Sequence, residues 1–364
     1  MISEKVSEYI AKFCLIILVL RIVMSSVFGI DTFSLTIVLN MLLLFAIGIT
    51  GHLAKKFSFL LCMFPIAIYN REILATIDVM LFVYLFRKTS IRDLAIYIYI
   101  IMFVAFCFVY VCGLIGIIDL HKPLYYTHRV EASYAFGFSN SNTFGVFIFS
   151  LLSCFYIVLR KYPKVLFVYV VFLVYLSFVL YNYTQSRGIM VGLLMLSFIH
   201  IFQSFHLIRH WMRYVIAVLP MILFLVNVYW TLFYVPDDIA NLSTSRLRIY
   251  REVVYSMTPL NWIIGTHLPS DEPMDGSFWM LIFGGGIFWA MFFYYNFYKS
   301  SVCCFDKIVV YLPIIIATVA YGIAENIFWS CNGLSIIFWM LVFSYYMEKS
   351  ESENSMLETN ARCL

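Results

Sequence analysis

The feature that most constrains this chain is the recurrence of apolar segments along almost its whole length. About 20 apolar residues are needed for a helix to cross a bilayer. Such segments recur at 13–30, 33–50, 57–69, 73–86, 95–118, 143–159, 165–182, 189–206, 212–235, 277–298, 308–325 and 328–347, of which the third and fourth are short. The pattern predicts an all-α, polytopic membrane protein with about twelve transmembrane helices.

Composition agrees with a single integral membrane domain over residues 1–364. Charged residues make up 12% of the chain, against about 25% in soluble proteins. The first apolar segment contains Arg21 and no small-residue cleavage site follows it, so we expect an uncleaved first span. The net charge of +4 comes from dispersed residues, which argues against a nucleic-acid partner. The nine cysteines lack the paired spacing of a zinc site or a disulfide framework.

The distribution of basic residues predicts the orientation of the spans. Lysine and arginine are retained on the cytoplasmic side in short loops. With the N-terminus inside, every inside segment holds at least two basic residues: Lys5, Lys12, Lys55, Lys56, Arg87, Lys88, Arg92, Arg160, Lys161, Lys164, Arg209, Arg213, Lys299, Lys307, Lys349 and Arg362. The polar tail 348–364 is then cytoplasmic, and its composition predicts disorder.

The basic residues that do not fit the inside segments are nearly all arginine. They are Arg21, Arg71, Lys122, Arg129, Arg187, Arg246, Arg248 and Arg251. A topology signal needs positive charge alone, whereas the planar guanidinium suits a carboxylate or phosphate held in a fixed geometry. The bias predicts an anionic ligand at the outer face, although an exposed or structural role is an alternative for each single arginine.

The stretch 236–276, between the ninth and tenth spans, is unusually long for a connection inside a bundle and is expected to be a large periplasmic loop. Ser245 offers an N-cap for a helix that runs to about Met257 and ends before Pro259. Helical spacing places Leu247, Tyr250 and Val254 on its buried face.

A second face of this helix carries Arg248, Arg251 and Tyr255, with Arg246 at its edge. Three guanidinium groups would then lie over the mouth of the bundle. The alternatives are an interfacial helix whose arginines meet lipid headgroups, or an ion pair between Arg248 and Glu252 one turn apart.

The second half of the loop gathers one histidine and three carboxylates next to a span. His267 and Asp275 are the candidates there for a general base. Such residues are also ordinary loop content. A metal site would need a second histidine to be convincing, and no metal is expected.

Charged residues inside or beside apolar sequence are costly unless they are paired. Glu325, at the end of the eleventh span, is one such residue and a further candidate for the site. Arg21 and Asp78 lie within the first and fourth apolar segments, where a structural pair between them is the simplest interpretation.

Three local elements, in this order and on the expected outer side, resemble the O-antigen polymerase and ligase superfamily. They are the glycine and asparagine element from Gly137 to Asn142, the Gln185-Ser186-Arg187-Gly188 element that opens a span, and the segment Asp275-Gly276-Ser277-Phe278 with Gly284 to Ile287. The layout of the whole chain is also similar, with about twelve spans, inside termini and one large outer loop late in the sequence.

The resemblance implies a metal-independent glycosyltransferase of the multi-spanning, GT-C-like type that needs no cofactor. Its donor would be an undecaprenyl-diphosphate-linked oligosaccharide in the bacterial inner membrane, with the active site facing the periplasm. Membrane lipid is an expected partner and a chain-length regulator protein is a candidate one. The residues assigned to substrate binding are Arg187, Arg246, Arg248, Arg251, Asn142 and Tyr255, and those assigned to catalysis are His267, Asp275 and Glu325.

Ligases of this superfamily tend to carry a histidine before the glycine-bearing span, where this chain has Asp275. This departure favours a polymerase that builds lipopolysaccharide or a related surface polysaccharide. A ligase acting on lipid A core, and a flippase or secondary transporter of lipid-linked glycan, are the alternatives. A transporter would use Arg21, Asp78 and Glu325 as coupling charges, but the two halves of the chain show no convincing repeat.

Overall fold

The protein is an assembly of helices with one minimal β-hairpin. The computed structural model describes residues 2–50, 64–67, 69–70, 72–124, 133–205, 207–233, 246–266, 268, 276–345 and 347. Two two-residue strands, β1 (Pro123–Leu124) and β2 (Ser133–Tyr134), pair antiparallel. The helices are α1 (Ile2–Ser26), α2 (Phe33–Thr50), α4 (Ile73–Leu85), α5 (Ile91–Leu114), α6 (Ser141–Leu159), α7 (Pro163–Thr184), α8 (Arg187–Ser204), α9 (Met212–Leu232), α11 (Arg246–Ser256), α12 (Pro259–Ile264), α13 (Ser277–Cys303), α14 (Phe305–Ile308), the 3-10 turn η2 (Val309–Tyr311), α15 (Leu312–Tyr321) and α16 (Gly333–Val342).

Eight of the helices in the described ranges are long and apolar enough to cross a membrane, so the chain is a multi-pass membrane protein. They are α1, α2, α5, α6, α7, α8, α9 and α13. Each overlaps one of the expected spans, although α1 begins well before the first of them. The expected span 57–69 falls mostly outside the described residues, and the tail 348–364 falls wholly outside them. The count of twelve therefore stays a prediction.

Local polar residues set where several helices begin. The Ser90 hydroxyl accepts from the main-chain N–H of Asp93, 3.1 Å away, at the start of α5. The Asn140 side chain accepts from Thr143 N at 2.7 Å and starts α6. Such caps satisfy N–H groups that a helix leaves without partners at its first turn.

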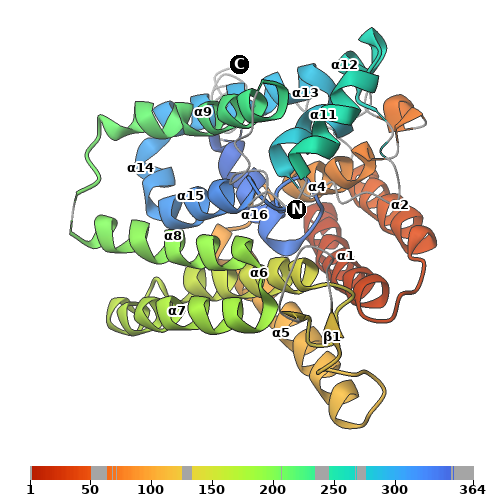
Figure 1. Cartoon of the computed structure of the whole chain (residues 1–364), viewed down its shortest axis with the longest axis vertical. Coiled ribbons are helices and arrows are strands. Elements are labelled where there is room, and N and C mark those ends of the chain that lie inside the picture. Colours follow the sequence, from red (N-terminus) through yellow and green to blue (C-terminus); the bar gives the residue numbers. More distant parts are fainter. Residues whose placement is uncertain are drawn as a thin grey trace.

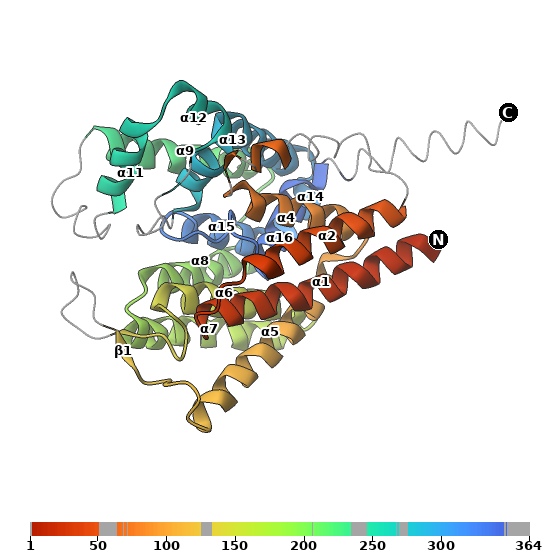
Figure 2. The same ribbon diagram turned by 90° about the vertical axis from the view of Figure 1, so that its right-hand side faces the viewer.

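The helices pack side by side in a bundle (Figure 1). In that view α9 and α13 lie on one side, α6 and α7 on the other, and α15, α16 and α8 between them. Helix α8 packs on α15 and on α7, while the first helix packs on α2 and α5. Figure 2 shows the chain beginning at one end of the bundle, with α11 and β1 at the opposite end.

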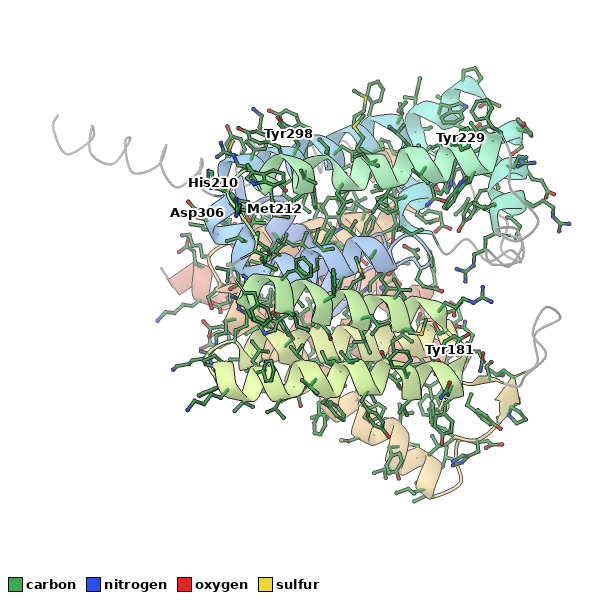
Figure 3. All side chains as sticks on the ribbon, turned by 60° about the vertical axis from the view of Figure 1, so that its left-hand side comes forward. Tyr181, His210, Met212, Tyr229, Tyr298 and Asp306 are labelled. Carbon is green, nitrogen blue, oxygen red and sulfur yellow. The ribbon has the colours of Figure 1, made fainter. Side chains whose placement is uncertain are left out.

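The helix ends alternate between the two ends of the bundle. Figure 3 shows Tyr181 and Tyr229, late in α7 and α9, at one end, and His210, Asp306 and Tyr298 toward the other. Hence the residues just before α9 and the turn after α13 lie at the same end of the bundle. The geometry agrees with the alternation on which the expected topology depends.

Two of the expected full-length spans are shorter than predicted. Residues 308–325 and 328–347 form α15 and α16, each of 10 residues, joined by the non-helical stretch 322–332. Every residue of α16 is buried, and α4, with 13 residues, is buried at all but two positions. Packing against other helices, rather than contact with lipid, explains their apolar composition.

Helix α13 contains a break that other segments complete. Gly286 has φ 76° and ψ 175°, a conformation that favours glycine. The carbonyl of Phe283 accepts from Thr266 N at 2.6 Å and from Asn70 Nδ2 at 3.1 Å, and that of Gly284 accepts from Asn70 Nδ2 at 3.0 Å. These donors form hydrogen bonds with two carbonyls that lose their partners within the helix at the break.

The expected pair between Arg21 and Asp78 is present in the N-terminal part of the bundle. Arg21 Nη1 lies 3.3 Å from Asp78 Oδ2 and donates to Thr36 Oγ1 at 3.1 Å. The Asp78 side chain is fully buried. The pair links α1, α2 and α4, which fits the structural interpretation.

Candidate functional site

The carboxylate of Glu325 lies in the non-helical stretch between α15 and α16 and pairs with the first residue of α11. Arg246 Nη2 is 3.3 Å and Nη1 3.4 Å from Glu325 Oε1. Arg246 also donates to the main-chain carbonyl of Ala324. The exposed fractions of the two side chains are 15% for Arg246 and 6% for Glu325. A buried carboxylate is thus matched by a guanidinium that is itself fixed in place.

The backbone around Glu325 is held by Ser277, the first residue of α13. Its hydroxyl donates to the carbonyl of Glu325 at 2.8 Å and accepts from Ile327 N at 2.8 Å and Phe328 N at 3.3 Å. Its own N–H donates to Gly322 O at 2.9 Å. Ser277 therefore forms hydrogen bonds with main-chain groups of the 322–332 stretch, which have no partners within a helix because this stretch is not helical.

Helix α11 is attached to the same region by Tyr250. The Tyr250 hydroxyl accepts from the N–H of Gly276 at 2.8 Å, one residue before α13 begins. The buried face predicted for α11 is confirmed, because Leu247, Tyr250 and Val254 are all buried. The helix that carries Arg246 is thereby fixed against the start of α13.

Two glycines let α8 and α6 approach the residues that precede Glu325. A Cβ on Gly188 would lie 2.2 Å from Tyr321 Cε2 and 2.9 Å from Glu325 Cγ. A Cβ on Gly145 would lie 2.9 Å from the Tyr321 hydroxyl and 3.3 Å from Ser186 Oγ. The Ser186-Arg187-Gly188 element, α6 and the 322–332 stretch therefore meet around Tyr321.

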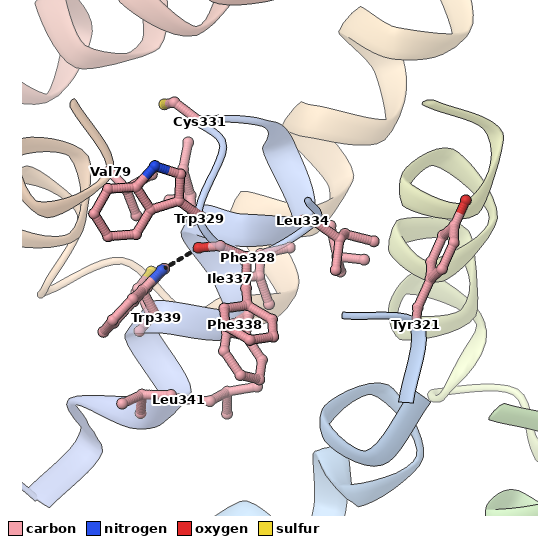
Figure 4. Close-up of a cluster of buried hydrophobic side chains, with 14 of the residues drawn as sticks. Val79, Tyr321, Phe328, Trp329, Cys331, Leu334, Ile337, Phe338, Trp339 and Leu341 are labelled. Atoms are coloured by element: carbon pink, nitrogen blue, oxygen red, sulfur yellow. Dashed lines mark hydrogen bonds between the residues drawn. The ribbon is translucent and has the colours of Figure 1, made fainter. Parts of the chain in front are cut away.

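Aromatic residues of the 322–332 stretch pack against aromatic residues of α16. Figure 4 shows Phe328, Trp329 and Trp339 close together, with the indole N–H of Trp339 donating to the Phe328 carbonyl at 2.6 Å. The rings of Phe328 and Phe338 stack with centroids 5.3 Å apart. Rigid aromatic packing fixes the stretch that carries Glu325.

The arginines of α11 do not form the single cluster predicted from helical spacing. Arg251 Nε donates to the carbonyl of Thr231 in α9 at 2.5 Å. Arg248 is 75% exposed at its side chain and lies 3.6 Å from Glu252 Oε1, which is the ion pair considered as an alternative. Arg246 alone of the three reaches Glu325. Long side chains can reach separate partners around a helix, and the three arginines have Glu325, the Thr231 carbonyl and Glu252 as theirs.

The other residues predicted for the site differ in exposure, and two of them lie outside the described residues. Arg187 is exposed at the first position of α8, and Asn142 is half-buried in the first turn of α6. Tyr255 is 72% exposed. His267 and Asp275 lie outside the described residues, so their placement as a base stays a prediction.

Tyr321 and Ser277 contribute to the arrangement although sequence reasoning gave neither of them a role in the site. Both lie at the edges of apolar segments, where a tyrosine or serine carries little signal. Within the ranges that the structure describes, no group of three His, Cys, Asp or Glu side chains could hold a metal ion.

The candidate site therefore consists of Arg187, Gly188, Arg246, Ser277, Tyr321 and Glu325. It provides the oriented guanidinium of Arg246 and the buried carboxylate of Glu325. It also includes the exposed Arg187, which directly precedes Gly188, where α8 lies close to Tyr321. No protein-family model, curated protein or solved structure matches the chain.

Proposed function

We propose that the chain is a polysaccharide polymerase that moves a growing glycan from its undecaprenyl diphosphate onto the next lipid-linked repeat unit. The observation that carries the proposal is the convergence of the Ser186-Arg187-Gly188 element, Arg246 and Glu325 at one end of a membrane bundle. These residues come from segments far apart in the sequence, and Arg187, Arg246 and Glu325 were candidates from the sequence alone.

The reaction requires a diphosphate to depart with the electron pair of the bond to the anomeric carbon. An acceptor hydroxyl forms the new bond to that carbon and gives up its proton to a base. Developing charge on the diphosphate is stabilised best by donors that are oriented before the reaction. Arg246 is oriented by Glu325 and by the Ala324 carbonyl, and Arg187 is exposed nearby, so these two residues suit the diphosphate.

Glu325 suits a positioning role better than the role of base. Its side chain is 6% exposed and engages Arg246, which leaves little surface for an acceptor hydroxyl. The proposal therefore assigns Glu325 to holding Arg246 in place. His267 and Asp275 stay the candidates for the base.

A lipid-linked substrate is also consistent with a membrane protein. A lipid-linked donor lies in the bilayer, and the chain has eight helices suited to crossing one. We place the reaction in the bacterial inner membrane at its periplasmic face, because the basic residues gather in the connections of the other side.

A second candidate is transport of a lipid-linked glycan. Short helices in a bundle interior, joined by non-helical backbone, are typical of transporter substrate sites. Helices α15 and α16 have this arrangement, and Arg21 and Asp78 add a buried charge pair. A ligase that transfers finished glycan is the runner-up among enzymes.

The test uses the purified full chain in detergent with a synthetic undecaprenyl-diphosphate repeat unit. A ladder of lengthened products on a gel is expected. Arg187→Ala and Arg246→Ala should remove the ladder, while Arg→Lys, which keeps the charge but loses the planar fork, should restore part of it. Arg209→Ala is the matched control, because Arg209 is exposed and precedes His210, which lies at the other end of the bundle (Figure 3).

Deletion in a cell that makes lipopolysaccharide separates the candidate functions. Loss of a polymerase leaves the flippase and ligase intact, so core carrying one repeat should remain. Loss of a ligase should leave bare core with long polymer on its lipid carrier. Bare core with single units trapped inside would instead assign transport and reject the polymerase.

A further inference from the structure

A cavity lies at the end of the bundle away from Glu325, between the first turns of α1 and the turn that joins α4 to α5. Its volume is about 620 Å³, within the range of about 300–1,000 Å³ usual for ligand pockets. Figure 2 shows the chain beginning at this end, opposite α11. The cavity is therefore separate from the candidate transfer site.

The lining of the cavity contains charges of both signs. The basic residues are Lys5, Lys12, Arg87 and Lys88, and the acidic ones are Glu4, Glu8 and Asp93. Lys12 Nζ lies 2.8 Å from Glu8 Oε1, and Lys88 Nζ lies 2.7 Å from Glu4 Oε1. A ligand that carries both a phosphate and an ammonium group would meet a partner for each.

These ion pairs are accessible enough to exchange partners. The side chains of Lys12 and Glu8 are 31% and 39% exposed, and those of Lys88 and Glu4 are 64% and 47% exposed. Ion pairs with such exposure contribute little to stability. A ligand phosphate can therefore replace a carboxylate beside a lysine without disrupting the fold.

Two apolar stripes begin beside Lys12 and lead away from the cavity. Lys12 Nζ lies 5.7 Å from the ring centroid of Tyr9 in α1 and 5.9 Å from that of Tyr97 in α5. On α1 the exposed residues Tyr9, Phe13, Ile16 and Leu20 follow one another at helical spacing. On α5, Ile100 and Val104 follow Tyr97 in the same way and are also exposed.

We propose that this cavity binds the headgroup of a glycerophospholipid with a primary ammonium, of the phosphatidylethanolamine class, and that the two stripes carry its acyl chains. The phosphate lies by Lys12 and Lys88, and the ammonium donates to Glu4 and Glu8. A choline headgroup has the same charge but no N–H donor, so it cannot form the second set of contacts. The lipid belongs to the leaflet at the end of the bundle where α1 begins.

The experiment titrates the purified full chain with three phospholipids of identical acyl chains and counts bound lipid by native mass spectrometry. Phosphatidylethanolamine should bind roughly tenfold more tightly than phosphatidylcholine, because it alone can donate to the carboxylates. Phosphatidylglycerol should bind less tightly than phosphatidylethanolamine. Equal binding of the ethanolamine and choline lipids, or tighter binding of phosphatidylglycerol, would overturn the proposal. This comparison needs no variant.

Variants separate the two halves of the headgroup. Lys12→Gln should weaken binding of all three lipids, because it removes a phosphate contact. The double variant Glu4→Gln/Glu8→Gln should remove the preference for ethanolamine over choline while choline binding persists. Lys161→Gln and Asp306→Asn are matched controls, since both residues are exposed and lie outside the lining. An ethanolamine preference that persists in the double variant would reject the assignment.

A headgroup without acyl chains tests the two stripes. Glycerophosphoethanolamine should compete at least about a hundredfold less well than the whole lipid, because it buries none of the apolar surface of α1 and α5. Equal competition would mean that the cavity binds a soluble phosphodiester rather than a membrane lipid. It would overturn the lipid assignment.

Discussion

Two arginine–carboxylate pairs have nearly the same geometry in different surroundings. Arg21 and Asp78 are 3.3 Å apart, as are Arg246 and Glu325, and each arginine side chain is 15% exposed. Arg21 and Asp78 both lie within regular helices. Glu325 lies in non-helical backbone, and Arg246 also donates to a main-chain carbonyl of that stretch.

The difference lies in what each pair holds in place. A pair between two regular helices stabilises their packing, because the backbone groups of both helices are already satisfied. The pair at Glu325 fixes a stretch that depends on side chains such as Ser277 for its hydrogen bonds. Equal distances therefore do not imply equal roles, and substitution of each pair should have different consequences for activity.

The largest expected effect is on stability, when one partner of either pair is removed. Asp78→Leu or Arg21→Met should each cost about 3–5 kcal/mol, because a buried charge loses its partner. The double variant Arg21→Met/Asp78→Leu should regain most of that stability and keep polymer formation. Unfolding of the purified protein in detergent, with polymer measured in parallel, checks both statements.

The corresponding double variant Arg246→Met/Glu325→Leu is the other half of the comparison. It should recover stability relative to Arg246→Met alone but still form no polymer, since the diphosphate contact is gone. Full polymer formation by this double variant would make the pair structural, like that at Arg21. Loss of polymer in a stable Arg21→Met/Asp78→Leu protein would instead assign a functional role to the N-terminal pair.

A smaller effect is expected from Gly188→Ala. The added Cβ would lie 2.2 Å from Tyr321 Cε2, so the buried Tyr321 ring or helix α8 must shift. Overpacking of this kind costs about 1–3 kcal/mol and should displace Arg187 from the site. Gly48→Ala is the matched control, because nothing lies within 4 Å of its Cβ in α2. If both variants retain equal stability and activity, the close approach at Gly188 is not needed.

Sequence predicted the regular helices well because apolar length is a strong signal, but it made α15 and α16 too long and the non-helical stretch between them too short. Residues 308–325 and 328–347 are both apolar, and apolar residues are favoured by burial against other helices as well as by contact with lipid. Apolar length alone therefore does not distinguish a short buried helix from a full span. The Arg21–Asp78 pair was predictable, since intramembrane charges need partners. The partner of Glu325 was not, because several outer arginines were available and the fold alone brings Arg246 to it.

Helical periodicity predicted the buried face of α11 but not the direction of its arginines. Leu247, Tyr250 and Val254 are fixed by the position of their Cβ atoms on the helix, so spacing was sufficient. The arginine side chains are long and reach partners that sequence does not reveal, such as the carbonyl of Thr231. Candidate residues with short side chains can therefore be placed from sequence more securely than those with long ones.

The smallest expected effect comes from Arg248→Ala, a few residues from Arg246 on the same helix. Its side chain is 75% exposed, and its partner Glu252 is 65% exposed at a distance of 3.6 Å. Exposed pairs at this spacing contribute about 0.3–0.5 kcal/mol, so the unfolding transition should hardly move. Polymer formation should stay near that of the unmodified chain, because Arg248 does not reach Glu325. A stable Arg248→Ala protein without polymer would mean that the substrate recruits this arginine, and the site would then extend from Glu325 across the exposed face of α11.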